Sequence, residues 1–406
     1  MAPTTLPVTL ADVEAARELL HGVVRPTPLE FSRALSDKVG GDVFLKCENL
    51  QRAGSFKIRG AYVRMTRLSD DEKARGVVAA SAGNHAQGVA LAARLLGIEA
   101  TVYMPTGAPM PKVNATRGYG AGVIFSGHTV DEALGAARAH EADTGAVLIH
   151  PFDHRDIVAG QGTVGLEILA ECPDVRTVVV CTGGGGLLAG VATAVKALRP
   201  DVQVIGVQAE QAAAYPPSLA AGKPVPLERM ATMADGIAVG CPGEVPYALV
   251  RELVDRVDVV GEEMLSRALL FLLERAKMVV EPAGAAGVAA LLDAPDRFEA
   301  PVVAVLSGGN IDPLLMLRVI RHGMAAAGRY LMLRLRVPDR PGSLAQLLAV
   351  LAETDANVLE VEHGRTAATL SVDEVEIGVQ LETKGAEHCA QVVARLRAEG
   401  YRLDAD

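Results

Sequence analysis

The sequence predicts an α/β protein with parallel sheets, followed by a small ferredoxin-like unit. From residue 41 to about 325, short apolar, β-branched runs alternate with alanine-rich stretches of helical periodicity. Strands that are apolar throughout are typical of parallel sheets covered by helices on both faces. After residue 325 the pattern changes to short alternating strands and two amphipathic helices. That order, βαββαβ, is the one of a ferredoxin-like fold.

The elements can be assigned in order along the chain. A first helix is expected over 8–24, because the proline-rich segment beginning at Arg25 cannot continue it. Strands are predicted at 41–47, 76–80, 100–104, 122–125, 146–149, 177–181, 203–208, 256–260 and 301–306. Helices are predicted at 85–96, 130–144, 157–171, 187–198, 262–274 and 285–292. Right-handed crossovers place the loops after these strands on one edge of a sheet, where ligands bind.

The last part of the chain follows a predicted linker at 325–328. Its strands are expected at 330–337, 357–363, 375–382 and 401–403, and its helices at 342–353 and 385–399. These elements form a unit that can fold around a small core of its own.

Composition limits the classes of function. A length of 406 residues predicts two or three domains. A net charge of −10 without a long basic run argues against a nucleic-acid partner. The five cysteines form no CxxC or Cys/His cluster, which argues against zinc and a disulfide framework. The start of the chain lacks the pattern of a signal peptide, and no apolar run reaches membrane-spanning length, so we expect a cytoplasmic protein.

Lys57 is the first candidate for chemistry. It lies in the segment ENLQRAGSFKIRG at 48–60, between a predicted strand and a predicted helix. Two arginines flank it and two apolar residues can shield it, namely Arg52, Arg59, Phe56 and Ile58. Desolvation or cationic neighbours lower the pKa of an amine and make it a nucleophile. The segment therefore suggests a Schiff-base lysine, with a solvated surface charge as the alternative.

Four consecutive glycines at 183–186 separate a predicted strand from a predicted helix. Glycine costs backbone entropy, so such a run needs a reason beyond capping. Backbone N–H groups that wrap a phosphate at a helix N-terminus give that reason. The spacing matches neither a dinucleotide-binding fingerprint nor a P-loop. A flexible hinge is the alternative.

Two further polar turns follow predicted strands. The turn SAGNH at 81–85 exposes N–H groups at a helix start, which is an anion site or a plain capped turn. The turn SGGN at 307–310 lets a ligand ring approach and offers the neutral hydroxyl of Ser307, unless it is an ordinary turn. Because these loops all follow strands, we expect them to converge on one crevice.

Together these segments resemble the fold-type II pyridoxal-phosphate enzymes, and most closely the threonine ammonia-lyases. The matching segments are ENLQRAGSFKIRGA (48–61), SAGNHAQG (81–88), GQGTVGLEI (160–168), GGGGL (183–187), ADGIAV (234–239) and SGGNID (307–312). The resemblance covers residues 8 to about 325. It implies a catalytic region at 1–325 with two parallel-sheet αβα domains. The large one would hold 1–75 and 153–325, and the small one 76–152.

The resemblance also implies roles for single residues. Lys57 would hold pyridoxal phosphate as a Schiff base and move the Cα proton, and Ser307 would face the pyridine nitrogen. The cofactor would be bound by Lys57, Phe56, Asn84, Gly183, Gly184, Gly185, Gly186, Leu187, Gly236, Glu281 and Ser307. The carboxylate of a small amino-acid substrate would be bound by Ser81, Ala82, Gly83, Asn84 and His85.

The implied reaction is β-elimination of L-threonine to 2-oxobutanoate and ammonia, in isoleucine biosynthesis or threonine catabolism. L-Serine would be a secondary substrate that gives pyruvate. Serine racemases carry serine at the position of Ala82 and acidic metal ligands at those of Gln208 and Ala214, so we expect weak racemisation and no metal at that place. The alternatives are an L-serine or 3-hydroxyaspartate dehydratase or racemase on the same fold, and a catalytically inactive ligand sensor.

The tail at 329–406, with VPDRPGSL at 337–344, resembles an ACT regulatory domain. This resemblance implies an isoleucine or valine effector. Its site would be formed by Asp339, Arg340, Pro341, Gly342, Ser343 and Leu344. A simple dimerisation unit is the alternative. We expect a homo-oligomer, either a dimer or a tetramer.

Overall fold

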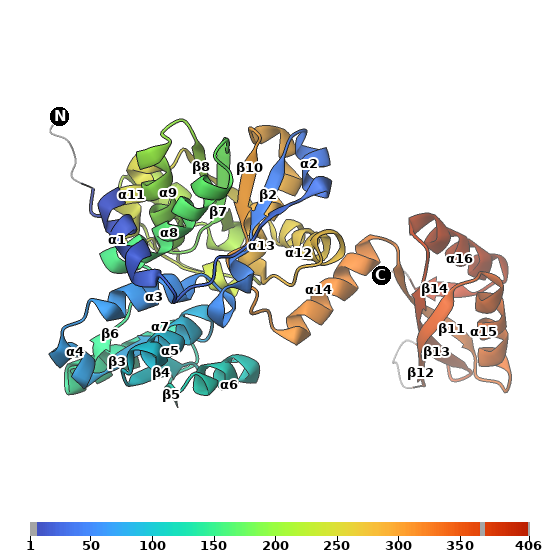
Figure 1. Cartoon of the computed structure of the whole chain (residues 1–406). Helices are drawn as coiled ribbons and strands as arrows, with labels where there is room; N and C mark the ends of the chain where they lie inside the picture. Colours follow the sequence, from blue (N-terminus) through green and yellow to red (C-terminus); the bar gives the residue numbers. More distant parts are fainter. Residues whose placement is uncertain (1–5, 366–369, 405–406) are drawn as a thin grey trace. The chain divides into compact units, whose positions relative to one another are not determined.

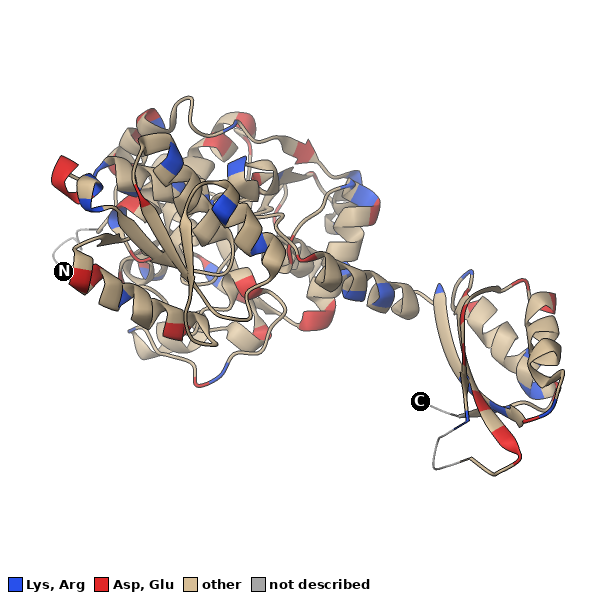
Figure 2. Cartoon of the chain, turned by 90° about the horizontal axis from the view of Figure 1, so that it is seen from below, with Lys and Arg blue, Asp and Glu red and all other residues tan. Residues whose placement is uncertain are grey.

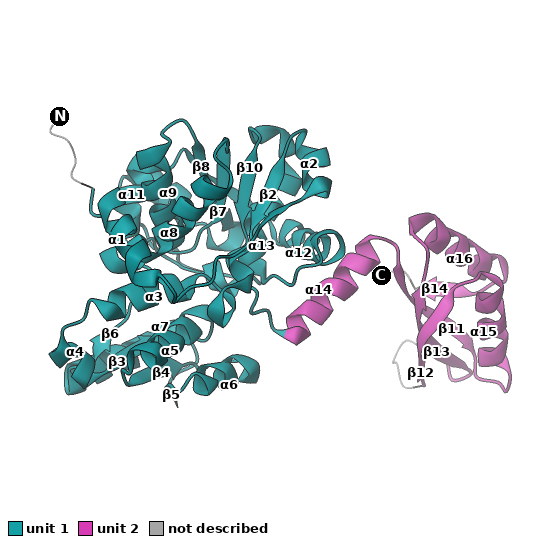
Figure 3. Ribbon diagram, in the orientation of Figure 1, with its two compact units in different colours: residues 1–312 teal, residues 313–406 magenta. Residues whose placement is uncertain are grey.

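The computed structural model describes residues 6–365 and 370–404. The chain divides into two compact units, Met1–Asp312 and Pro313–Asp406 (Figure 3). Helix α14 (Pro313–Ala326), which the sequence did not predict, belongs to the second unit by its contacts. The sequence had predicted the boundary at the linker 325–328 instead.

The larger sheet of the first unit has six strands in the order β1-β2-β10-β7-β8-β9 (Figure 1). Only β1 runs antiparallel to its neighbour, and the other pairs are parallel. The central strands β7 and β10 are buried along their whole length, as their valine-rich sequences predict. The bounds are β1 Leu29–Phe31, β2 Val43–Lys46, β7 Thr177–Cys181, β8 Gln203–Ala209, β9 Arg256–Val260 and β10 Val302–Val305.

The smaller sheet has four parallel strands in the order β5-β4-β3-β6. In the sequence it lies between β2 and β7 of the larger sheet. Its bounds are β3 Val77–Ala80, β4 Ala100–Met104, β5 Gly122–Phe125 and β6 Val147–Leu148. The prediction of two parallel sheets with helices between the strands is therefore confirmed, apart from the antiparallel edge strand β1.

The helices of this unit include several that were not predicted. The helices that the sequence did not predict are α2, α4, α6, α10 and α11, and most of these are short. The bounds are α1 Leu10–Leu20, α2 Arg33–Val39, α3 Lys57–Thr66, α4 Asp70–Arg75, α5 Asn84–Leu96, α6 Met110–Gly118, α7 Val130–Thr144, α8 Arg155–Glu171, α9 Gly186–Leu198, α10 Tyr215–Ala221, α11 Glu244–Leu253, α12 Glu262–Phe271 and α13 Pro282–Asp293.

Glycines allow α8 to pack closely against α3 and α9. A Cβ atom at Gly160 of α8 would lie 2.7 Å from the Cα of Gly60 in α3. A Cβ atom at Gly162 would lie 2.8 Å from the carbonyl oxygen of Gly190 in α9. No side chain fits in these gaps, so the segment GQGTVGLEI acts in helix packing. This packing fixes the start of α3, where Lys57 lies.

A buried ion-pair network holds the same helix. Arg59 of α3 is fully buried, and it donates to Glu48 at 2.8 Å and to Glu167 of α8 at 2.6 Å. Lys46 of β2, also fully buried, lies 2.8 Å from Glu167 and 2.8 Å from Glu171. The network therefore connects β2, α3 and α8.

The second unit has the predicted βαββαβ order after α14. Its antiparallel sheet has the strand order β12-β13-β11-β14. Leu335, Ile377, Leu347 and Val392 form part of a core between the sheet and two helices. The bounds are β11 Tyr330–Pro338, α15 Ser343–Glu353, β12 Asn357–Gly364, β13 Glu374–Glu382, α16 Ala386–Ala398 and β14 Arg402–Asp404.

Charged residues of both signs are distributed along the helices and strands of each unit (Figure 2). Within the part of the chain that the structure describes, every helix is too short or too polar to cross a lipid bilayer.

We expect Arg59→Met to lower the free energy of unfolding by about 3–5 kcal/mol, because it leaves Glu48 buried without its partner. Urea unfolding of the full chain measures this change. Arg199→Met is the matched control, since the ion pair of Arg199 with Asp201 is solvent-exposed, and its unfolding midpoint should stay close to the wild-type value. Equal midpoints for the two variants would show that the buried network is dispensable.

Candidate active site

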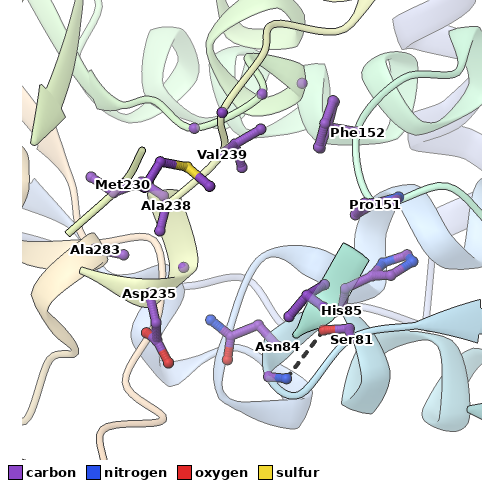
Figure 4. Close-up of a pocket in the computed structure, with 18 of the residues that line it drawn as sticks. Ser81, Asn84, His85, Pro151, Phe152, Met230, Asp235, Ala238, Val239 and Ala283 are labelled. Atoms are coloured by element: carbon purple, nitrogen blue, oxygen red, sulfur yellow. Dashed lines mark hydrogen bonds between the residues drawn. The ribbon is translucent and has the colours of Figure 1, made fainter. Parts of the chain in front are cut away.

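The predicted site residues surround one cavity of about 760 Å³ in the first unit. It lies beyond the carboxyl ends of strands from both sheets. Figure 4 shows Ser81, Asn84 and Asp235 on one side of the cavity and Phe152 and Val239 on the opposite side. The predicted residues that line it are Phe56, Lys57, Ser81, Ala82, Gly83, Asn84, His85, Gly183, Gly184, Gly185, Gly186, Leu187, Gly236, Glu281 and Ser307. The predicted effector residues belong to the second unit, where residues 339–342 lie between β11 and α15 and Ser343 and Leu344 begin α15.

Lys57 is the first residue of α3, and its side chain reaches the cavity. Its Nζ atom donates to the carbonyl oxygen of Pro151 at 3.0 Å. Burial lowers the pKa of Lys57 to about 8, although Cys181 and Glu281 act in the opposite direction. Arg59 is engaged by Glu48 and Glu167, so the expectation that it activates the lysine as a cationic neighbour is wrong. Desolvation is the cause of the lowered pKa.

The loop after β10 is held beside Lys57 by backbone hydrogen bonds. The N–H of Phe56 donates to the carbonyl oxygen of Ser307 at 3.2 Å. Ser55 also forms an antiparallel bridge with Gly308. Ser307 is buried and lines the cavity close to Cys181, the last residue of β7. Two segments far apart in the sequence are thus fixed together at the site.

The glycine loop between β7 and α9 presents free N–H groups to the cavity. For the N–H groups of Gly183, Gly184 and Gly185, the structure shows no acceptor among the residues it describes. Gly186 and Leu187 open α9, and N–H groups in the first turn of a helix have no intrahelical partner. A row of such donors at a helix N-terminus fits a phosphate group.

Each glycine of this loop is also approached closely by atoms of other segments. A Cβ atom at Gly183 would lie 3.0 Å from the Cα of Ile237, and one at Gly184 would overlap the Phe152 ring. One at Gly185 would overlap the hydroxyl of Tyr215, and the φ of +95° at Gly185 also favours glycine. The run of glycines is therefore needed for space, which argues against a flexible hinge.

The turn between β3 and α5 presents a second group of donors. The N–H of Gly83 is used internally, since it donates to Ser81 Oγ at 3.1 Å (Figure 4). For the N–H groups of Ala82, Asn84 and His85, no acceptor occurs in the described parts of the chain. They fit a carboxylate. His85 itself is neutral, because burial lowers its pKa to about 3, and its Nε2 donates to the carbonyl oxygen of Ile149 at 2.7 Å.

Glu281 and Asn84 form a buried polar pair. The amide nitrogen of Asn84 donates to Glu281 Oε1 at 2.5 Å, and its amide oxygen accepts from Asn310 at 2.7 Å. Burial, followed by the nearby Asp235, raises the pKa of Glu281 to about 7. Asn84 keeps one N–H for another partner.

Several cavity residues were missed from the sequence. Lys112 of α6 pairs with Asp235 at 2.6 Å, and burial lowers the pKa of His150 to about 4. His150 and Phe152 lie in the loop after β6, so their position after a strand was a usable signal. Asp235 lies inside the segment ADGIAV, of which only Gly236 was singled out. The described residues contain no group of His, Cys, Asp and Glu side chains able to hold a metal.

Comparison with known proteins identifies the family. The family described as pyridoxal-phosphate dependent enzyme matches residues 20–308. The chain belongs to this family. Its members use pyridoxal phosphate, and the free N–H groups and the Lys57 amine in the cavity fit that cofactor. The ACT domain family matches residues 331–388 of the second unit.

Individual relatives of this pyridoxal-phosphate enzyme extend the comparison. L-threonine ammonia-lyase of Thermotoga maritima is 48% identical over 396 residues, which is 98% of this chain and 99% of the relative. The structure of maize serine racemase matches with a TM-score of 0.74 and 35% identity, over 79% of this chain and 99% of that one. Threonine deaminase isoform 2 from Solanum lycopersicum, in its processed form, matches with a TM-score of 0.74 and 38% identity, over 77% and 86%.

We expect Lys57 in the cofactor-free enzyme to react with an amine-selective reagent with a pH midpoint of about 8. Below that pH the amine holds its proton and is unreactive, whereas an ordinary lysine loses its proton only near 10.5. Brief labelling across a pH series, followed by peptide mass spectrometry, measures the midpoint. The exposed Lys223 in the same digest is the control. A Lys57 profile identical to that of Lys223 would contradict the desolvation argument.

Proposed function

We propose that this chain is an L-threonine ammonia-lyase, which converts L-threonine to 2-oxobutanoate and ammonia and, more slowly, L-serine to pyruvate and ammonia. The observation that carries the proposal is one amine of lowered pKa, Lys57, in a cavity with two groups of free N–H donors. The 48% identity to an L-threonine ammonia-lyase over almost the whole chain supports the choice of substrate.

Pyridoxal phosphate, when bound, supplies an electron sink that makes the Cα proton of an amino acid acidic. Lys57 accepts this proton, because a pKa of about 8 leaves part of its amine unprotonated near neutral pH. The N–H groups of Ala82, Asn84 and His85 bind the substrate carboxylate and so fix the orientation of Cα. The hydroxyl leaves Cβ as water, so that Cα and Cβ are joined by a double bond in an enamine. The enamine tautomerises to an imine, which a water molecule hydrolyses to the oxo acid and ammonia.

The remaining residues favour elimination over competing reactions. The N–H groups of residues 183–187 would hold the phosphate of the cofactor, and Asn84 would hydrogen-bond its ring hydroxyl. Phe56 and Gly236, which line the cavity, would contact its ring. Ser307 would offer the ring nitrogen a neutral hydroxyl, which stabilises a protonated ring less than a carboxylate does, so elimination would compete better with transamination. Glu281 supports Asn84 through their hydrogen bond.

A racemase is the second candidate, because the structure of maize serine racemase matches as well as that of the threonine deaminase. Ala82 favours the lyase, since its methyl group has no proton to deliver to Cα. The proposal assigns catalysis to residues 1–325 and regulation by isoleucine or valine to residues 329–406. We also propose that the protein is cytoplasmic and that it forms a homo-oligomer.

We expect Lys57→Ala to abolish release of 2-oxobutanoate from L-threonine, because the proton acceptor and the cofactor attachment are both lost. The assay follows the oxo acid with L-threonine, L-serine and 3-hydroxyaspartate, together with D-serine formation. Lys223→Ala is the control for an exposed lysine and should keep wild-type rates. Ammonia release by Lys57→Ala would contradict the mechanism, and fast D-serine formation by the wild type would favour the racemase.

We expect deletion of 329–406 to leave lyase activity and to remove any response to isoleucine or valine, because the effector site lies in that unit. Initial rates with and without each amino acid measure the response. Asp339→Ala in the full chain breaks the ion pair with Arg365. This substitution alone should weaken the response to isoleucine or valine. An unchanged response of the truncated enzyme would refute this regulatory role.

A further inference from the structure

A buried phenol lies behind the glycine loop. Tyr215, the first residue of α10, is fully buried, and it is not among the residues that line the cavity. Its hydroxyl donates to the carbonyl oxygen of Gly184 at 3.3 Å. A Cβ atom at Gly185 would overlap this hydroxyl. Tyr215 therefore contacts the loop from the side that faces away from the cavity.

The carbonyl of Gly184 is held by two donors. Besides the Tyr215 hydroxyl, the N–H of Gly243 donates to it at 3.1 Å. In a trans peptide the C=O and the following N–H point in opposite directions. Because both donors hold the carbonyl on the outer side, the N–H of Gly185 points to the opposite side, toward the cavity. The orientation of this N–H thus depends on what binds the carbonyl behind it.

The position of Tyr215 is itself fixed by a buried amide. Gln208, near the end of β8, accepts from the backbone N–H of Tyr215 at 2.8 Å, and its Nε2 donates to the carbonyl oxygen of Ala212 at 3.4 Å. Burial raises the pKa of Tyr215 well above its usual value, so the phenol remains a hydrogen-bond donor. A continuous chain of contacts runs from β8 through Gln208 and Tyr215 to the glycine loop.

We propose that Tyr215 is a positioning residue for the cofactor phosphate, because its hydroxyl fixes the Gly184–Gly185 peptide with the Gly185 N–H directed into the cavity. This inference rests on the proposed role of residues 183–187 in binding the phosphate. Tyr215 raises the affinity for the cofactor by orienting the backbone of the glycine loop, and it does not contact the cofactor itself.

The test is Tyr215→Phe in the full-length enzyme, which removes one oxygen atom and adds no volume. Cofactor-free protein is titrated with pyridoxal phosphate and, separately, with pyridoxal, which lacks the phosphate. We expect the dissociation constant for pyridoxal phosphate to rise about 2- to 10-fold, the range for loss of one neutral hydrogen bond. The constant for pyridoxal should not change. The ³¹P NMR resonance of the bound cofactor should shift.

Tyr247→Phe is the matched control. Tyr247 is also buried, and its hydroxyl donates to the carbonyl oxygen of Ser218 at 3.1 Å instead of to a residue of the glycine loop. Both variants lose one buried phenol hydroxyl, so a general loss of stability should affect them alike. Only Tyr215→Phe should change the affinity ratio of the two ligands and the ³¹P resonance. Equal changes in both variants would overturn the inference.

A second variant covers the case in which Tyr215→Phe does not fold. Gln208→Met removes the acceptor for the Tyr215 N–H and should also weaken binding of pyridoxal phosphate relative to pyridoxal. If Tyr215→Phe does fold, the effect of Gln208→Met should be smaller in the Tyr215→Phe background, because both residues act on the same peptide. An unchanged affinity ratio in Gln208→Met and in any folded Tyr215→Phe protein would overturn the role of Tyr215.

The titrations distinguish a failure of phosphate binding by the glycine loop from a failure of the positioning role of Tyr215. If the wild-type enzyme binds pyridoxal as tightly as pyridoxal phosphate, the glycine loop does not bind the phosphate, and the role of Tyr215 falls with it. If the wild type strongly prefers pyridoxal phosphate and Tyr215→Phe keeps the same preference, the loop binds the phosphate without help from Tyr215.

Discussion

Backbone N–H groups without internal partners, held toward one cavity, are the feature on which the site depends. An unsatisfied buried donor costs about 1–3 kcal/mol, so a chain keeps such groups only where packing fixes them or a ligand binds them. Here two turns at strand ends provide them, one before α9 and one before α5. Ile237, Phe152 and Tyr215 pack closely against the first turn. The rigidity of a glycine-rich loop therefore comes from its neighbours.

The protonation states of the buried side chains in the cavity also bear on how ligands are bound. Burial lowers the pKa of Lys57 to about 8 and that of His85 to about 3, and it raises the pKa of Glu281 to about 7. Near physiological pH His85 is thus neutral, whereas part of the Lys57 amine is unprotonated and part of the Glu281 carboxyl is protonated. The buried guanidinium of Arg59 forms ion pairs with Glu48 and Glu167. Its charge is therefore compensated and contributes little to the electrostatic potential in the cavity. The N–H dipoles of the two turns are suited to the anionic groups of the ligands, and part of the Lys57 amine is available for proton transfer.

The sequence predicted the strands and the loops that follow them, because apolar runs ending in glycine-rich polar turns are local signals. It did not predict the contacts between distant segments. Arg59 and Glu167 are 108 residues apart, and only the fold shows that they cancel each other's charge. Tyr215 and Phe152 lie in ordinary local sequence, and their contact with the glycine loop depends on where α10 and the loop after β6 are placed. Short helices such as α2 and α6 offered too few turns to show a period.

The chemistry that distinguishes this enzyme from its structural neighbours does not follow from the shared fold. A serine racemase and a threonine deaminase match the fold with the same TM-score of 0.74, so the framework is common to both reactions. Under the proposed function, an amino acid bound through its carboxylate would meet the N–H groups of the turn before α5 and the amine of Lys57. The outcome would then depend on whether a second group can return a proton to Cα from the side opposite Lys57. Ala82, in the turn before α5, offers only a methyl group, and the lack of a proton donor at this position favours elimination.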